Sequence, residues 1–216
     1  MRIKTQEDLQ RQKNTQLIRD ILGEEYSSLS YEGLKIFENP NRTDVQCCLV
    51  VTTAKKQIES REISGSGFGL VDALFSTLLA EYANDCVSTT ALRLEEFYIF
   101  VDRADLKRQT QEGKTGAGAL VKTCLIVNNG NNGLVPFRSI SHSVIAAMAQ
   151  VVFSAMEFFI NSERAVHKLR VCVRDATKRK RPDLTELYTF KMAELVKNAS
   201  YAESLKTYGL EEKKEE

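Results

Sequence analysis

Hydrophobic and polar positions follow two different periods along the chain, and the periods succeed one another in a fixed order. Residues 45–53 are rich in Val, Leu, Thr and Cys, the composition of a half-buried β-strand, and shorter strand candidates at 34–38 and 56–63 flank this segment. From Gly69 to Tyr82 the apolar residues step by one, three and four, which predicts a helix with one buried face. The first predicted unit is therefore three strands followed by a helix.

The same order follows in the next part of the chain. Further strands are predicted around 94–101, 120–128 and 134–140, and the Asn- and Gly-rich run at 129–133 indicates a tight turn between the last two. Residues 104–117 are charged and Gly-rich, which is typical of an exposed loop.

A long helix closes the second unit. It is predicted from Ser141 to about Asn161, with Ser141 or Ser139 as its N-cap. Apolar residues surround most of its circumference, so we expect it to be covered on more than one side.

These patterns predict an α+β fold of duplicated βββα units with internal pseudo-twofold symmetry. Helical extensions flank it at both ends. Residues 1–29 form the N-terminal extension, with a polar helix over 5–22, and residues 30–162 form the doubled domain. Residues 163–216 comprise a basic connector and a C-terminal amphipathic helix that starts at Pro182.

Composition narrows the function classes. The chain has 216 residues, 30 Lys plus Arg and 29 Asp plus Glu, and this balance excludes a globally basic nucleic-acid coat and an acidic disordered chain. The five Cys include no Cys-x-x-Cys pair, so we expect reduced packing residues, and the two His are too far apart for a local metal motif. No metal site or cofactor is predicted.

The chain carries no clean membrane span in its sequence. The longest apolar stretch, around 144–160, is interrupted by Gln150, Ser154 and Glu157, and residues 1–6 have no apolar signal core. We therefore expect a cytoplasmic protein that does not bind membranes.

The sharpest local motif is the run from Ser64 to Ala73, at the first strand-to-helix junction. Its glycines stand at alternate positions, 65, 67 and 69, where the backbone can take a positive φ and approach another surface. The run has no Lys after the glycines and no Gly-x-Gly-x-x-Gly spacing, which argues against nucleotide binding. A tight turn for close packing and a pocket for a carboxylate or small ligand both remain open.

The motif Gly65-x-Gly67-x-Gly69-Leu70-Val71-Asp72-Ala73, followed by an apolar helix, resembles the Gly-x-Gly-Pro-Val-Asp-Ala signature of the C-terminal regulatory domain of α-isopropylmalate synthases, which citramalate synthases share. The run from Arg138 to Ala147 is similar to the corresponding part of the second unit in that family. The resemblance covers roughly residues 30–162, and the family fold is two βββα units. Leu70 stands where the family usually has Pro, and the second unit lacks the family's glycines before its helix.

The resemblance implies a non-catalytic regulatory protein, because the catalytic barrel of the family and its metal-binding residues are absent from the chain. In the family, the regulatory domain dimerises and binds a branched-chain amino acid between subunits. The implied partners are a second copy of the chain, a catalytic synthase, and a small amino-acid effector such as leucine.

Carried over by motif position, the amino group and carboxylate of the effector would be met at the two strand-to-helix junctions. Leu70, Val71 and Ile140 would contact its aliphatic side chain. Asp72 can pair with the ammonium or cap its own helix, and the serines can bind the effector or act as N-caps. The implied ligand-binding residues are Gly65, Gly67, Gly69, Leu70, Val71, Asp72, Ala73, Ser139, Ile140, Ser141 and Ser143.

Two other functions remain open. The chain can be an oligomeric scaffold in which the glycine motif packs and the terminal helices recruit a protein. Alternatively, the basic segment 164–181, which ends in Lys178-Arg179-Lys180-Arg181, can bind nucleic acid. The segment carries no interleaved aromatic residues, which disfavours single-strand stacking, and a solvated connector between helices is the simpler interpretation.

Overall fold

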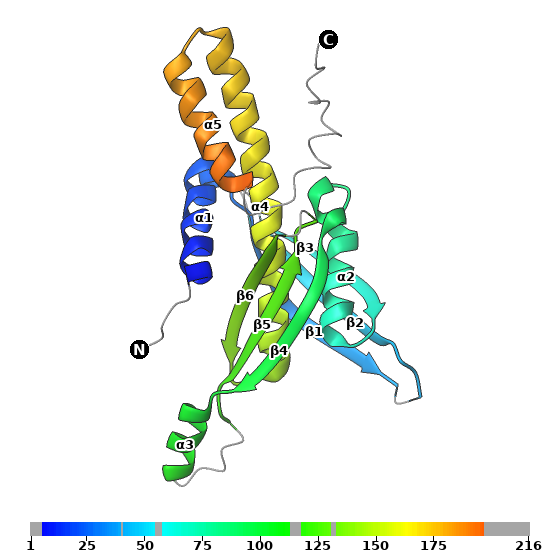
Figure 1. Cartoon of the computed structure of the whole chain (residues 1–216). Coiled ribbons are helices and arrows are strands. Elements are labelled where there is room, and N and C mark those ends of the chain that lie inside the picture. The colour runs from blue at the N-terminus through cyan, green and yellow to red at the C-terminus, as the bar shows by residue number, and fades with distance from the viewer. Residues whose placement is uncertain (1–5, 40, 55–57, 113–117, 131–132, 197–216) are drawn as a thin grey trace.

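The computed structural model describes residues 6–39, 41–54, 58–112, 118–130 and 133–196, and these form an α+β fold with two three-stranded antiparallel sheets and five α-helices (Figure 1). The elements in chain order are α1 (Gln6–Leu22), η1 (Gly23–Glu25), β1 (Ser28–Glu38), β2 (Val45–Ala54), β3 (Ile58–Gly67), α2 (Leu70–Tyr82), η2 (Val87–Ala91), β4 (Arg93–Val101), α3 (Arg103–Gln111), β5 (Val121–Asn128), β6 (Leu134–Ser141), α4 (Val144–Lys178) and α5 (Pro182–Val196).

The predicted order of three strands and a helix occurs twice, with α3 inserted in the second unit. The sheet orders are β1-β2-β3 and β4-β5-β6, so each sheet is a simple meander. The burial pattern of the central strands β2 and β5 explains why these segments form strands. Alternate residues are buried along both β2 and β5, which places one face of each sheet on the core.

Strand β1 is longer than predicted, beginning at Ser28 rather than near Leu34. Its first residues, Ser28 to Tyr31, pair with the end of β2 from Ala54 back to Val51. Leu29 is buried in the core, so a short run with modest strand propensity is held in place by its neighbour and by burial.

The prediction of a loop over 104–117 is wrong for its first part, because Arg103–Gln111 is helix α3; residues 113–117 lie outside the described residues. Asp102 caps this helix by accepting a hydrogen bond from the Ala104 amide. Only Asp105 and Gln109 are buried on α3, so polar contacts and not an apolar face dock it, and a hydrophobic pattern could not reveal it.

Helix α4 is 35 residues long and does not end near Asn161 as predicted. No Gly or Pro occurs between residues 144 and 181, so nothing in the backbone chemistry interrupts it. The N-cap prediction is also wrong, since Ser143 and not Ser139 or Ser141 accepts the hydrogen bond from Ala146 N. The helix therefore runs without a break through the predicted domain boundary at 162/163.

The two halves of α4 have different neighbours. Its first half contacts β5, β6, β1 and α2, which covers it on several sides as its apolar circumference predicts. Its second half projects beyond the sheets and pairs with α5, while α1 lies alongside (Figure 1). By length and composition alone α4 could cross a membrane, with a mean hydropathy of 1.6 in its most apolar window, but 61% of that window is buried in the fold, as in the core helix of a globular protein.

Hydrogen bonds that are buried at Asn161 and partly buried at Glu157 hold the N-terminal extension against α4. Asn161 accepts from the Ser27 amide at 2.9 Å and donates to the Ser27 carbonyl at 2.7 Å. Glu157 accepts from the Tyr26 hydroxyl and from the Leu29 amide. Burial and the adjacent Glu157 carboxylate raise the pKa of Tyr26 to about 12, so its hydroxyl stays a donor at neutral pH.

Candidate functional site

The glycine motif lies at the junction between β3 and α2. Gly65 and Gly67 belong to β3, where they pair with Cys47 and Val45 of β2. A Cβ on Gly67 would stand 2.5 Å from the Ala73 backbone nitrogen and 2.5 Å from Asp72 Oδ2, and a Cβ on Gly65 would stand 2.2 Å from Thr77 Oγ1. Both positions therefore require glycine because α2 packs directly against the strand.

Gly69 and Asp72 shape the start of α2. Gly69 is the N-cap with φ +93°, a conformation that an L side chain rarely adopts. Asp72 Oδ2 accepts a hydrogen bond from the Phe68 amide at 2.7 Å, which ties the first turn of α2 to the residue before its N-cap, whereas the N-cap makes no side-chain capping hydrogen bond. Among the described residues no hydrogen bond uses Asp72 Oδ1. The Phe68 side chain is 82% exposed at the tip of the turn.

The other motif residues of this junction face inward. Val71 and Ala73 are buried in the core, and Leu70 is partly buried against it. An effector at the junction would thus meet the backbone of Val71 and Ala73 rather than their side chains. Gly65 also lines a hollow of about 360 Å³ on the first sheet, together with Phe37, Ser64 and Ser66.

The second junction joins β6 to α4 through serines. Ser139 Oγ donates to Gln150 Oε1 at 2.8 Å, and Ser141 Oγ accepts from the Ser143 amide at 3.2 Å. Ile140 is half-buried. Val144 and Ile145, the first two residues of α4, are 41% and 46% exposed, so apolar surface lies beside this junction as it does at Phe68.

Sheet register places the two junctions in corresponding positions. Gly65 and Gly67 pair with the third and first residues of β2, and Ser139 and Ser141 pair with the third and first residues of β5. Gly69 and Ser143 follow as the two N-caps. The three glycines and the three serines thus occupy matching sites, and the hydrogen bonds of each junction stay within its own unit.

Both units share one further irregularity. The pairing of the first strand with the second shifts register between Tyr31 and Gly33 and again between Leu94 and Glu96. The bulged residues are Glu32 and Glu95. Glu32 accepts a hydrogen bond from Thr52 of β2, and Glu95 accepts one from Asn128 of β5.

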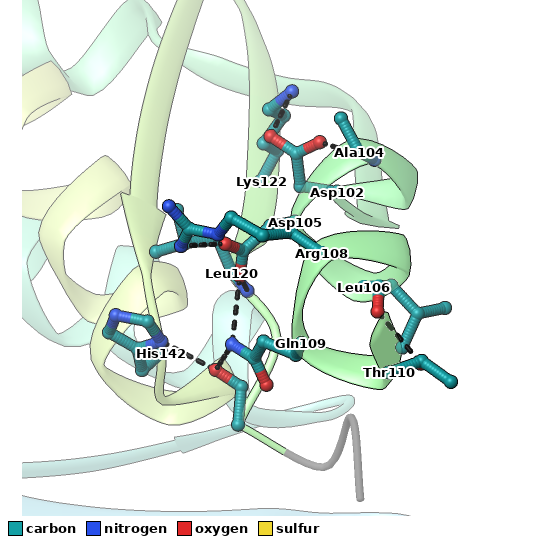
Figure 2. A network of polar contacts seen from close by, with 11 residues as sticks. Asp102, Ala104, Asp105, Leu106, Arg108, Gln109, Thr110, Leu120, Lys122 and His142 are labelled. Carbon is teal, nitrogen blue, oxygen red and sulfur yellow. Dashed lines mark hydrogen bonds and ion pairs between the residues drawn. The ribbon is translucent and has the colours of Figure 1, made fainter. Parts of the chain in front are cut away.

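A polar network links α3 to the second junction (Figure 2). Asp105 accepts hydrogen bonds from the Leu120 amide at 2.9 Å and from Gln109 Nε2 at 3.0 Å, and Gln109 Nε2 also donates to the Gly118 carbonyl. His142 Nδ1 lies 2.6 Å from that same carbonyl. The hydrogen bond from Leu120 and the adjacent Arg108 guanidinium lower the pKa of Asp105, so the network is built around a carboxylate.

The basic segment 164–181 is part of α4 and of the turn to α5 rather than a separate connector. Several of its cations have partners in the chain. Arg164 donates to Ser27 Oγ, Lys168 donates to the Leu22 carbonyl, and Arg179 and Arg181 pair with Asp175 and Asp183. The charge available to an external polymer is therefore smaller than the sequence suggests.

Comparisons with known proteins leave the family open. No protein-family model matches the chain, and no curated protein matches it in sequence. Within the described residues, no group of three or more His, Cys, Asp or Glu side chains is arranged to hold a metal ion.

Proposed function

We propose that the chain is a non-catalytic regulatory protein that senses a small branched-chain amino acid or a related effector, as the resemblance to the regulatory domain of α-isopropylmalate synthase implies. The observation that carries this proposal is the correspondence of the two junctions in sheet register, together with exposed apolar residues beside each of them. We further propose that the two βββα units are related by an internal pseudo-twofold axis, which the matched bulges in β1 and β4 support.

The chemistry of the junctions suits a zwitterion with an aliphatic side chain. The N-termini of α2 and α4 present backbone N–H groups and partial positive charge, which favour a carboxylate. Asp72 Oδ1 can accept from an ammonium while Oδ2 stays bonded to Phe68 N. Phe68, Val144 and Ile145 offer exposed apolar contact.

In this proposal the site is completed by a second copy of the chain. The effector would then bridge two junctions, one from each protomer, that the interface brings together. Binding at such an interface couples the effector to assembly, and assembly can then be read by a catalytic synthase partner.

Titration calorimetry with L-leucine, L-valine and L-isoleucine tests this function. We expect heat with at least one of them at millimolar ligand, and loss of that heat in Ile145→Glu, which places a charge on exposed apolar surface without touching the core. Glu186→Lys on α5 is a control that leaves both junctions unchanged. Absence of heat with all three ligands would contradict sensing.

A second candidate, an oligomeric scaffold without a ligand, is favoured by the packing of the glycines. The spaces beside Gly65 and Gly67 are occupied by Thr77, Asp72 and Ala73 of the same chain. A scaffold predicts self-association that no amino acid alters. Nucleic-acid binding through 164–181 stays a weaker prediction, which salt-dependent retention on heparin would test.

A further inference from the structure

A mixed-charge cavity lies far along α4 from the second junction, where α1, the end of α2 and α4 meet. Its volume is about 370 Å³, within the range of roughly 300–1,000 Å³ common for small-ligand sites. The lining residues are Leu22, Glu25, Asp85, Cys86, Glu163, Arg164, His167, Lys168 and Val171. None of these belongs to the two junctions, and Arg164, His167, Lys168 and Val171 lie in the basic segment 164–181.

Glu163 is the unusual residue of this cavity. Its side chain is 5% exposed, and Oε2 accepts two hydrogen bonds from Ser88, one from the amide at 3.0 Å and one from the hydroxyl at 2.6 Å. Its other oxygen, Oε1, is buried and has no hydrogen-bond partner in the described part of the chain. A buried carboxylate oxygen without a donor costs on the order of 1–3 kcal/mol, so a water or a ligand group that reaches Oε1 from the cavity would supply a favourable donor.

The remaining charges of the cavity fall into two groups. Asp85 and Glu25 add negative charge near Glu163, and Arg164, His167 and Lys168 add donors on α4. Lys168 is held toward α1, since it donates to the Leu22 carbonyl at 3.2 Å and lies 3.4 Å from Glu25. Leu22 and Cys86 are buried apolar walls.

Cys86 carries little thiolate at neutral pH. Burial, followed by the nearby Glu163 carboxylate, raises the pKa of the Cys86 thiol to about 12. The thiol is therefore protonated at neutral pH, and Cys86 forms a buried apolar wall of the cavity.

We propose that this cavity binds a small zwitterion, an amino-acid-sized molecule whose ammonium donates to Glu163 Oε1 and whose anionic group is met by the basic side chains of α4. Lys168 is already paired with Glu25, but within the described residues Arg164 donates only to the neutral Ser27 hydroxyl, so a cation alone would leave Arg164 without an anion. An anion alone would leave Glu163 Oε1 unsatisfied. Because the cavity joins α1, α2 and α4, its ligand would tie the N-terminal extension to the two-unit core. The inference does not rest on the function proposed for the junctions.

The test is a titration of the full ¹⁵N-labelled chain with L-alanine, L-leucine and L-serine, followed through its backbone amide shifts. We expect at least one of them to shift the amides of Ser88 and residues 163–168. The matched amine and acid of the best binder, which each lack one charge, should bind at least about tenfold more weakly, the effect of one charge-assisted hydrogen bond.

Two variants make the result specific. Glu163→Gln keeps an acceptor for Ser88 but turns an N–H group toward the ligand ammonium, so we expect affinity to fall at least about tenfold. Asp175→Asn removes the same charge from an exposed site on the same helix and should bind normally. Shifts confined to residues 65–73 and 139–145 would support the junction site and overturn this proposal.

A cavity that holds only water would give a different pattern. Water would then supply the donor to Glu163 Oε1, so no zwitterion would shift the amides of Ser88 or Glu163, and added amino acid would leave the melting temperature unchanged. Equal affinity of Glu163→Gln and the parent chain would also overturn the proposal.

Discussion

The two strand-to-helix junctions have the same register but opposite tolerance for side chains. In the first, α2 lies so close to β3 that a Cβ at position 65 or 67 would overlap Thr77 or the backbone of Ala73. In the second, Ser139 and Ser141 occupy the matching positions and use their hydroxyls within the junction. A glycine motif can therefore arise from close packing of a helix on a strand as well as from contact with a ligand. Substitutions at the matched positions of the two junctions distinguish these two causes.

The largest difference is expected between Gly67→Val and Ser141→Val. Valine at position 67 must displace the backbone of Ala73, so we expect it to lower the free energy of unfolding by about 3 kcal/mol or more. Valine at 141 loses one hydrogen bond to Ser143, which is worth about 1 kcal/mol. Urea unfolding of both variants measures the difference, and equal losses would show that the packing of the two junctions does not differ.

A smaller contrast is expected between Gly65→Ala and Ser139→Ala. The new methyl group at 65 meets Thr77 Oγ1, which donates to the Ala73 carbonyl and cannot move without breaking that bond, so we expect a loss of about 1–3 kcal/mol. Ser139→Ala removes a bond between partly exposed groups and should cost less than about 1 kcal/mol. In a double-mutant cycle, Thr77→Ala should recover part of the loss at 65 but none of that at 139.

The side-chain hydrogen bonds at the two helix starts should differ more modestly. Ser143→Ala removes the acceptor for the Ala146 amide and is expected to cost about 1 kcal/mol, whereas Ser143→Asp should retain the cap. At the first junction Asp72→Asn keeps an oxygen for the Phe68 amide and should leave thermal stability nearly unchanged. A loss in Asp72→Asn as large as that in Ser143→Ala would mean that the charge of Asp72, and not its hydrogen bond, stabilises α2.

The smallest effect concerns α3, a helix of the second unit that has no counterpart in the described part of the first. The pKa of Asp105 is lowered in the folded chain, so its contribution to α3 docking is present above the unfolded Asp pKa of about 3.9 and is lost as the pH falls through the folded value. We expect hydrogen-exchange protection of the Leu120 amide to hold at neutral pH and to fall in this acidic range. Asp105→Asn should weaken the protection of the Leu120 amide at neutral pH and abolish its further loss at acidic pH. If that acidic loss is unchanged in the variant, another carboxylate causes it.

The periodicity of apolar residues alone predicted the central strands and α2. Apolar residues recur along β2 and α2 at the positions that the fold buries. Periodicity could not predict α3, which docks through the polar contacts of Asp105, or the length of α4, whose second half is covered by α1 and α5 rather than by a sheet.

The candidate sites also combine features that the sequence predicts with features that only the fold shows. The glycine run was visible as a motif, but its match to Ser139, Ser141 and Ser143 depends on sheet register. The unsatisfied oxygen of Glu163 depends on contacts with Ser88 and η2 that lie far away in the sequence. Sequence patterns show which local elements form, whereas these sites arise from distant residues that meet only in the fold.

Sedimentation equilibrium of the full chain, with and without millimolar L-leucine, tests most directly whether the two junctions form an effector site across a dimer interface. We predict a dimer whose dissociation constant changes when leucine is present, because a ligand held between protomers is linked to their association. A chain that stays monomeric under both conditions, or a dimer that leucine leaves unchanged, would contradict the proposed function.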